Sequence, residues 1–206
     1  MSACENLKVE RCPQCGAPAQ LSARRCGYCE AEFIVTSLAS LDRIDRAGIQ
    51  KYVSHYRKQL AEEPESGELH LAMGICHLDL GLHDLASKSF AKAIETLPEN
   101  PDNYYYQALA IIKGRKPKLL SLKEVREIEN NLTAAGQLDP GRAVYRYLLL
   151  AVKYEFYLKN GLKVPPPTIE ELLSEAKACE CASDEIERLL NRVPIQDERL
   201  LKVLSS

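Results

Sequence analysis

Residues Gly67–Asn100 read GELHLAMGICHLDLGLHDLASKSFAKAIETLPEN, and this stretch decides the fold. Small residues at Gly74 and Ala86 would allow two antiparallel helices to cross closely. Gly81 would open the turn between these helices, and Pro98 would stop the second one. Phe90 and the small residues near it would then pack onto a following pair. The stretch therefore predicts a helix pair that stacks against further copies of itself.

The same landmarks recur at a period of 34 residues, since Tyr56 precedes Phe90 and Pro64 precedes Pro98 by that distance. A period of this length is typical of helical solenoids. The 67–100 stretch resembles a tetratricopeptide (TPR) repeat, and nearly every signature position of that family is matched. The resemblance implies a mainly α-helical, TPR-like solenoid.

The neighbouring repeats are weaker. Residues 33–66 keep Tyr56 and Pro64 but lack the pair of small residues, and the repeat that ends at Pro140 carries 8 extra residues. We expect this insertion at residues 113–121, between two helices. A fourth pair and two final helices, which would cap the apolar end of the solenoid, are expected at residues 143–160, 168–181, 183–192 and 196–204. Residues 36–206 would thus contain about ten helices.

Four of the eight cysteines form two C-x2-C pairs ten residues apart, namely Cys12, Cys15, Cys26 and Cys29. Each pair can present two thiolates to one face of a metal ion, and both pairs complete a tetrahedral Cys4 shell. Gly16, directly after the first pair, suits the positive φ that such a turn needs, whereas Glu30 stands in the equivalent place after the second. The segment is too short to bury a useful core. Metal binding would supply its folding free energy, about 10–16 kcal/mol in small zinc peptides.

This cysteine segment resembles the short zinc ribbon found at the ends of bacterial proteins, which implies a small β domain over residues 1–35. The expected cofactor is one structural Zn2+, because four Cys ligands leave no open coordination position for catalysis. A rubredoxin-like iron centre, a redox-active C-x2-C pair and a metal-free segment are the alternatives. The ten-residue gap is shorter than in longer ribbons, but no ligand is lost.

TPR solenoids bind peptides or helices in a groove lined by their first helices. The resemblance implies that the groove positions here are Leu71, Ile75, Leu78, Tyr105, Leu109 and Ile112. An apolar, tyrosine-bearing groove favours an amphipathic helix or peptide segment of a partner protein. The alternative is that the protein's own C-terminal helices fill the groove.

One short segment concentrates positive charge, namely the basic loop made of Lys113, Arg115, Lys116 and Lys118. It is either a solvated loop or a contact for phosphate or an acidic partner. The cysteine segment, residues 8–32, carries four basic and three acidic residues, which is too little positive charge for nucleic acid to be the first choice of ligand.

The composition is that of a soluble globular chain: 46% of the 206 residues are hydrophobic, 27% are charged, and the net charge is −2. No signal-peptide core or long apolar stretch is visible, so we expect a cytoplasmic protein without membrane insertion. No catalytic constellation stands out. The sequence therefore predicts a non-enzymatic adaptor that joins protein partners. A regulator whose zinc ribbon contacts DNA or RNA is the alternative.

Overall fold

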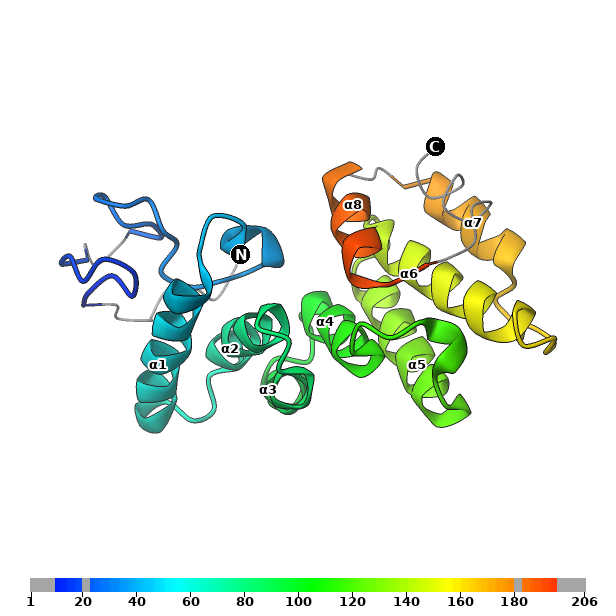
Figure 1. The fold of residues 1–206 in the computed structure, drawn as a ribbon, viewed down its shortest axis with the longest axis horizontal. Helices are drawn as coiled ribbons and strands as arrows, with labels where there is room; N and C mark the ends of the chain where they lie inside the picture. The colour runs from blue at the N-terminus through cyan, green and yellow to red at the C-terminus, as the bar shows by residue number, and fades with distance from the viewer. Residues whose placement is uncertain (1–9, 20–22, 180–182, 196–206) are drawn as a thin grey trace. The chain divides into compact units, whose positions relative to one another are not determined.

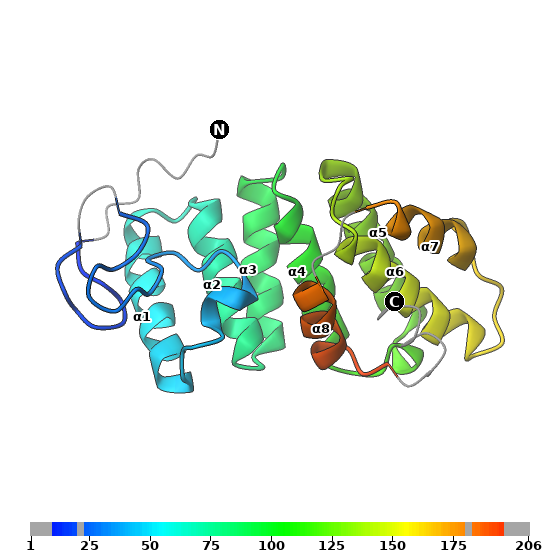
Figure 2. The same ribbon diagram turned by 90° about the horizontal axis from the view of Figure 1, so that it is seen from above.

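The computed structural model describes residues 10–19, 23–179 and 183–195, and most of these are helical (Figures 1 and 2). The chain divides into two compact units, Met1–Thr96 and Leu97–Ser206. The described part of the first unit holds the cysteine segment, a 3-10 turn η1 (Leu38–Leu41) and helices α1 (Arg46–Glu62), α2 (Gly67–Asp79) and α3 (His83–Thr96). The described part of the second holds α4 (Pro101–Ile112), η2 (Pro117–Leu119), α5 (Leu122–Leu138), α6 (Val144–Lys153), η3 (Tyr154–Leu158), α7 (Ile169–Lys177) and α8 (Ser183–Arg192).

Helices α2 and α3 form the antiparallel pair predicted from residues 67–100. Gly81 lies in the turn between them with a φ of +75°, a conformation that glycine adopts without strain. Gly74 faces the fully buried ring of Phe90, because a Cβ added at Gly74 would lie 2.4 Å from Phe90 Cε1. The close approach at Gly74 is thus real, but the ring of Phe90 fills it from within the same pair.

The repeat expected at residues 33–66 contains one α-helix, α1, instead of two. The Asp45 side chain caps this helix by accepting a hydrogen bond from the Gly48 N–H at 2.8 Å. In place of a first helix, the chain runs extended into the η1 turn, which packs against α2. Tyr56, fully buried on α1, donates to the Phe33 carbonyl (3.2 Å) and accepts from the Val35 N–H (2.9 Å). These bonds hold the extended segment where a helix was expected.

In the second unit, α4 and α5 form the next pair, and residues 113–121 are the inserted connection that the sequence predicted. Lys113 ends α4 in the left-handed conformation. The Ser121 hydroxyl and the Glu124 carboxylate then form a capping box that starts α5. The insertion is therefore an ordered loop between two helices.

Helix α6 continues into a π-helical turn, η3, and α7 starts at a capping box formed by Thr168 and Glu171. The buried Lys153 on α6 donates to the carbonyls of Pro165 (2.9 Å) and Pro167 (3.0 Å), which fixes the proline segment that connects the two helices. Helix α8 has the bounds expected from the sequence, and it packs on α6. The final helix expected at residues 196–204 lies outside the described residues.

Arg142, just before α6, joins three helices of the second unit. Its guanidinium donates to the Asp102 carboxylate on α4 at 2.5 Å and to Glu185 on α8 at 2.6 and 3.0 Å. It also donates to the Tyr145 hydroxyl at 3.0 Å. Burial raises the pKa of Asp102, and the positive charge of Arg142 opposes that rise. In this unit, α8 is therefore fixed over α4 and α6 by the protein's own side chains.

Candidate metal centre and interaction surfaces

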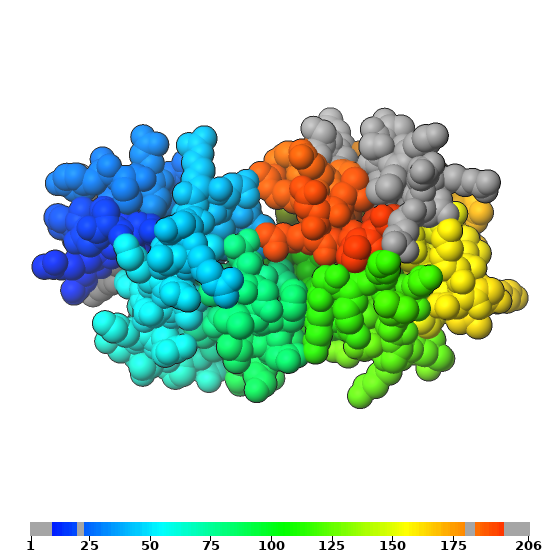
Figure 3. Space-filling model, in the orientation of Figure 1, coloured from blue at the N-terminus to red at the C-terminus, as the bar shows by residue number. Residues whose placement is uncertain are grey.

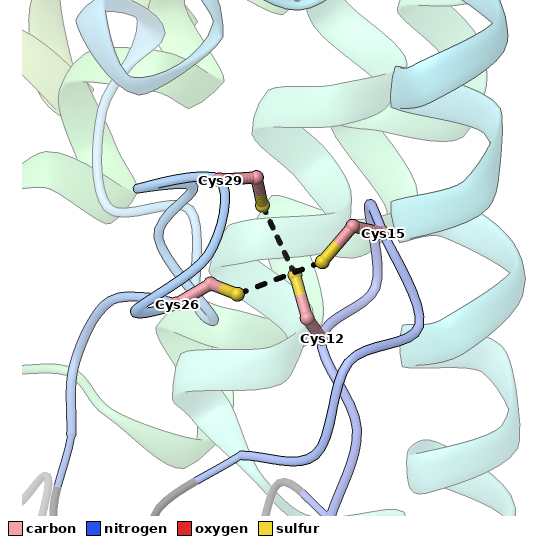
Figure 4. Close-up of side chains that lie close together, drawn as sticks. All are labelled: Cys12, Cys15, Cys26 and Cys29. Carbon is pink, nitrogen blue, oxygen red and sulfur yellow. Dashed lines mark hydrogen bonds between the residues drawn. The ribbon is translucent and has the colours of Figure 1, made fainter.

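The four predicted ligand cysteines converge on one point. Their Sγ atoms all lie within 4.8 Å of one another, and Figure 4 shows the four side chains pointing inward from two turns. The Sγ atoms of Cys12 and Cys29 are 3.6 Å apart, as are those of Cys15 and Cys26. A tetrahedral Zn2+ with Zn–S bonds of about 2.3 Å places its sulfurs about 3.8 Å apart. The geometry therefore fits one tetrahedral metal ion.

The two C-x2-C turns have the same backbone hydrogen bonds. In the first turn, Cys12 N donates to Ala17 O at 2.8 Å and Gly16 N donates to Cys12 O at 2.9 Å. In the second turn, Cys26 N donates to Ala31 O and Glu30 N to Cys26 O, both at 2.9 Å. Since each bond recurs 14 residues later, we call the two turns the first and second knuckle. This repetition places the two cysteine pairs in equivalent positions.

Over residues 10–19 and 23–35, the predicted β ribbon is not formed as strands. The described residues of this segment contain two isolated antiparallel bridges, Arg11–Pro18 and Arg25–Glu32, one beside each knuckle. The hydrogen bonds of the knuckles and a small cluster of Cys12, Cys26 and Phe33 with neighbouring alanines account for the local structure. So small a core contributes little stability, and a metal ion held by the four cysteines would add to it.

The residue after each cysteine pair adopts a positive φ, as the sequence predicted for the first. Gly16 has a φ of +74° and Glu30 a φ of +58°. A residue with a Cβ is strained in this region, by about 1–2 kcal/mol. The second knuckle therefore carries a strain that the first avoids.

The thiol pKa values show why this cluster suits a cation. The Tyr28 N–H donates to the Cys26 Sγ at 3.4 Å and lowers the pKa of that thiol to about 7. The Ala31 N–H also lowers the pKa of Cys29, but burial and the three neighbouring sulfurs outweigh it and raise the value to about 12. Four adjacent thiolates repel one another, and a divalent cation removes that repulsion.

The knuckles and the residues after them form hydrogen bonds with α1, and in the space-filling view they lie directly against this helix (Figure 3). The Gln14 side chain donates to Gly48 O at 2.9 Å, and Lys51 donates to Gln14 O at 3.3 Å. The Tyr52 hydroxyl donates to Glu32 O. Because these bonds join residues 20 to 37 positions apart, the cysteine segment and α1 belong to one compact unit.

The six residues expected to line the groove are all buried. Those in the first unit are on α2 and those in the second on α4, with exposed fractions from 0 to 6%. The six are Leu71, Ile75, Leu78, Tyr105, Leu109 and Ile112. The chain itself covers these six side chains in this structure, as it would if its own helices filled the groove.

The four residues of the basic loop have different environments in the structure. Arg115 closes the end of α4 by donating to the carbonyls of Ile111 (3.0 Å) and Ile112 (3.2 Å), and it forms an ion pair with Glu124 at 2.6 Å. Lys113, Lys116 and Lys118 remain at least partly exposed. Arg115 thus has a structural role, and the three lysines supply the positive surface.

Sequence reasoning missed two surfaces. One is a cluster of exposed leucines beside the basic loop: Leu119 on η2, Leu158 on η3 and Leu162 just after it have exposed fractions of 65, 48 and 47%. The other is a groove between the first knuckle and α1. Exposed leucines and surface lysines leave no pattern that differs from ordinary solvated residues, so no sequence signal could have located either surface.

No family model matches the chain, and no curated protein sequence matches it. Two solved structures are similar in part. The crystal structure of MamA has 20% sequence identity and a TM-score of 0.48, over 78% of this chain and 77% of MamA. TTC0263, a thermophilic TPR protein of Thermus thermophilus, has 18% identity and a TM-score of 0.44, over 77% of this chain and 90% of its own. With both TM-scores below 0.5, the helical-pair architecture rests on the contacts described above.

None of the helices in the described ranges has the length and apolar character needed to cross a membrane.

Proposed function

We propose that this protein is a protein-interaction scaffold in which a structural Zn2+ stabilises the N-terminal knuckles and a TPR-like helical array presents the partner surface. The proposed zinc module comprises residues 1–35 and the proposed array residues 36–206. Cys12, Cys15, Cys26 and Cys29 would hold the ion, and these four ligands complete a tetrahedral shell. The ion would supply folding free energy and would take part in no reaction.

The observation that carries the proposal is the exposed leucine cluster of the second unit, which we call the leucine surface (Leu119, Leu158 and Leu162). Segments η2 and η3 contact each other, and the Asn160 side chain joins them by donating to Lys118 O at 3.2 Å. Exposed apolar side chains gathered on adjoining segments and bordered by polar residues are typical of protein-binding surfaces.

The charge around the leucine surface indicates the kind of partner. Lys116 and Lys118 precede Leu119, and Lys159 and Lys163 lie on either side of Leu162. A partner helix with an apolar face and acidic edges would bury the leucines and pair with these lysines. This partner class agrees with the amphipathic segment expected from the sequence, but the contact surface differs from the expected groove.

The test is affinity capture from the encoding organism with the full chain and two matched variants. Leu119→Asp/Leu158→Asp alters the leucine surface, and Leu82→Asp/Leu85→Asp alters two leucines of the first unit that are 42 and 46% exposed. Circular dichroism first confirms that both variants retain the helical content of the parent.

We expect a stoichiometric protein partner with the parent chain and with the Leu82/Leu85 control, and at least a tenfold lower recovery with the Leu119/Leu158 variant. Equal recovery with both variants would contradict the leucine surface. Recovery of DNA or RNA instead of protein would favour the nucleic-acid regulator. Metal analysis of the same samples should give one zinc per chain, whereas iron and a visible absorption band would contradict the zinc assignment.

A further inference from the structure

The first unit contains an open groove of about 470 Å³ between the first knuckle and α1. The knuckle contributes Arg11, Cys12 and Pro13 to one wall. The other wall is one face of α1, formed by residues three, four or seven positions apart: Ala47, Gln50, Lys51, Ser54, His55 and Lys58.

The groove is positively charged. Arg11, Lys51 and Lys58 carry permanent charges, and among the described residues no acidic side chain lines it. Within α1 the first acidic residue is Glu62, one turn beyond Lys58, and Asp45 before the helix is engaged as its cap. An anionic ligand therefore finds three cations and no acidic side chain along the described walls.

His55 also lines the groove. Its Nε2 atom is buried and has no hydrogen-bond partner among the described residues. Burial and the charge of Lys58 lower the pKa of this imidazole.

We propose that this groove binds an extended acidic peptide segment of a partner protein, an assignment that rests on the proposed function of a protein-interaction scaffold. Lys51 and Lys58 are seven residues apart, which is about 10 Å along the helix axis. Acidic residues at every third position of a polyproline II segment recur at about 9 Å on one face. Such a segment matches the spacing of the two lysines.

The lining favours a peptide over nucleic acid. Single-stranded nucleic acids are held by aromatic side chains that stack on the bases, and among the described residues no aromatic ring other than the His55 imidazole lines this groove. The net charge of the chain is −2, so its overall field does not attract a long polyanion. A short segment with few acidic residues needs only the local field of Arg11, Lys51 and Lys58.

The test uses the zinc-loaded full chain and a fluorescein-labelled twelve-residue probe with Glu at every third position, measured by fluorescence anisotropy. A matched probe carries Gln in place of Glu. Lys51→Glu/Lys58→Glu reverses two groove charges. Arg57→Glu/Lys88→Glu makes the same change of charge at residues outside the groove. Circular dichroism and zinc content check that each variant is folded.

We expect at least a tenfold increase in Kd for the groove variant, less than a twofold increase for the control variant, and at least tenfold weaker binding of the Gln probe. Equal weakening by both variants would overturn the proposal, because it would mean unspecific attraction. Tighter binding of a twelve-nucleotide thymidine oligomer, lost in the groove variant, would overturn the peptide as occupant. Should the double variant not fold, Lys58→Glu alone replaces it, since the hydrogen bonds that join the knuckle to α1 use Gln14 and Lys51 instead.

The leucine-surface variant separates this proposal from the proposed function. Leu119→Asp/Leu158→Asp lies in the other unit and should bind the Glu probe as the parent does. If the groove variant binds the probe normally while the leucine variant still loses its partner, only the groove proposal fails. If the groove variant loses the probe while the leucine variant keeps its partner, only the leucine surface fails.

Discussion

The contact between Gly74 and Phe90 gives the sharpest test of the helix pair. A Cβ at Gly74 would lie 2.4, 2.6 and 2.9 Å from three atoms of the Phe90 ring, whereas carbon atoms in contact are normally about 3.5–4.0 Å apart. The ring is fully buried, so it cannot move toward solvent. The change Gly74→Ala therefore forces the ring or the helix to shift by about 1 Å.

Two effects of this change oppose each other. Alanine favours the helix over glycine by about 1 kcal/mol. Overpacking a buried contact costs about 1–3 kcal/mol, and an overlap this severe belongs at the upper end. We therefore expect Gly74→Ala to lower the free energy of unfolding by about 1–2 kcal/mol.

Gly136 on α5 provides the matched control, because a Cβ added there meets nothing within 4 Å. Gly136→Ala should raise the free energy of unfolding by about 0.5–1 kcal/mol through helix propensity alone. Urea unfolding followed by circular dichroism in the far ultraviolet measures both changes. The double variant Gly74→Ala/Phe90→Leu should recover part of the loss, since the smaller side chain leaves room for the methyl group. If Gly74→Ala stabilises the protein as Gly136→Ala does, the assigned crossing of α2 and α3 is wrong.

Three further predictions concern the knuckles, the Arg142 network and pH. Glu30→Gly should stabilise the zinc-loaded first unit by about 1 kcal/mol and Gly16→Ala should destabilise it by a similar amount, because both positions need a positive φ; thermal unfolding of the two variants should shift in opposite directions. Arg142→Ala should lower the free energy of unfolding of the second unit by about 2–3 kcal/mol and increase hydrogen exchange in α8, whereas Arg188→Ala, which breaks an exposed pair with Asp184, should change it by less than about 0.5 kcal/mol. The Ser121 N–H and Arg115 lower the pKa of Glu124 to about 2, so this carboxylate stabilises the fold above pH 4.5 and the contribution is lost as the pH falls toward 2. Glu124→Gln should therefore destabilise the protein by roughly 1 kcal/mol at pH 7 and by much less near pH 2, and equal effects at both values would contradict the assignment.

Features that depend on residues close together in the chain could be predicted from the sequence. The spacing of Cys12, Cys15, Cys26 and Cys29 is enough to place four thiols around one point, because a four-residue turn brings each pair together. The helix pair around Gly81 and the capping box at Thr168 are equally local, since caps and turns are satisfied within a few residues.

The features that were missed depend on contacts between distant residues. Tyr56 binds the backbone of Phe33 and Val35, more than twenty residues away, and so fixes an extended segment where the repeat pattern predicted a helix. The repeat period could not show that the Phe90 ring packs against Gly74 of the same helix pair. In the same way, Arg142 joins α8 to α4, because it binds Asp102 and Glu185, each about forty residues away from it in the sequence.

The sequence by itself determined the mainly α-helical class, the pairing of the four cysteines and the bounds of α8, because helix propensity, caps and the spacing of cysteines act over short distances. Only the tertiary structure decided which side chains reach the surface. In this structure the six expected groove residues, of which Leu71 is the first and Ile112 the last, are buried, whereas Leu119 and Leu158 are exposed. The tertiary structure also placed the first knuckle beside the basic face of α1. A side chain is buried only where another element packs over it. Because hydrophobic attraction is non-directional, the apolar face of a single helix does not determine which element that will be.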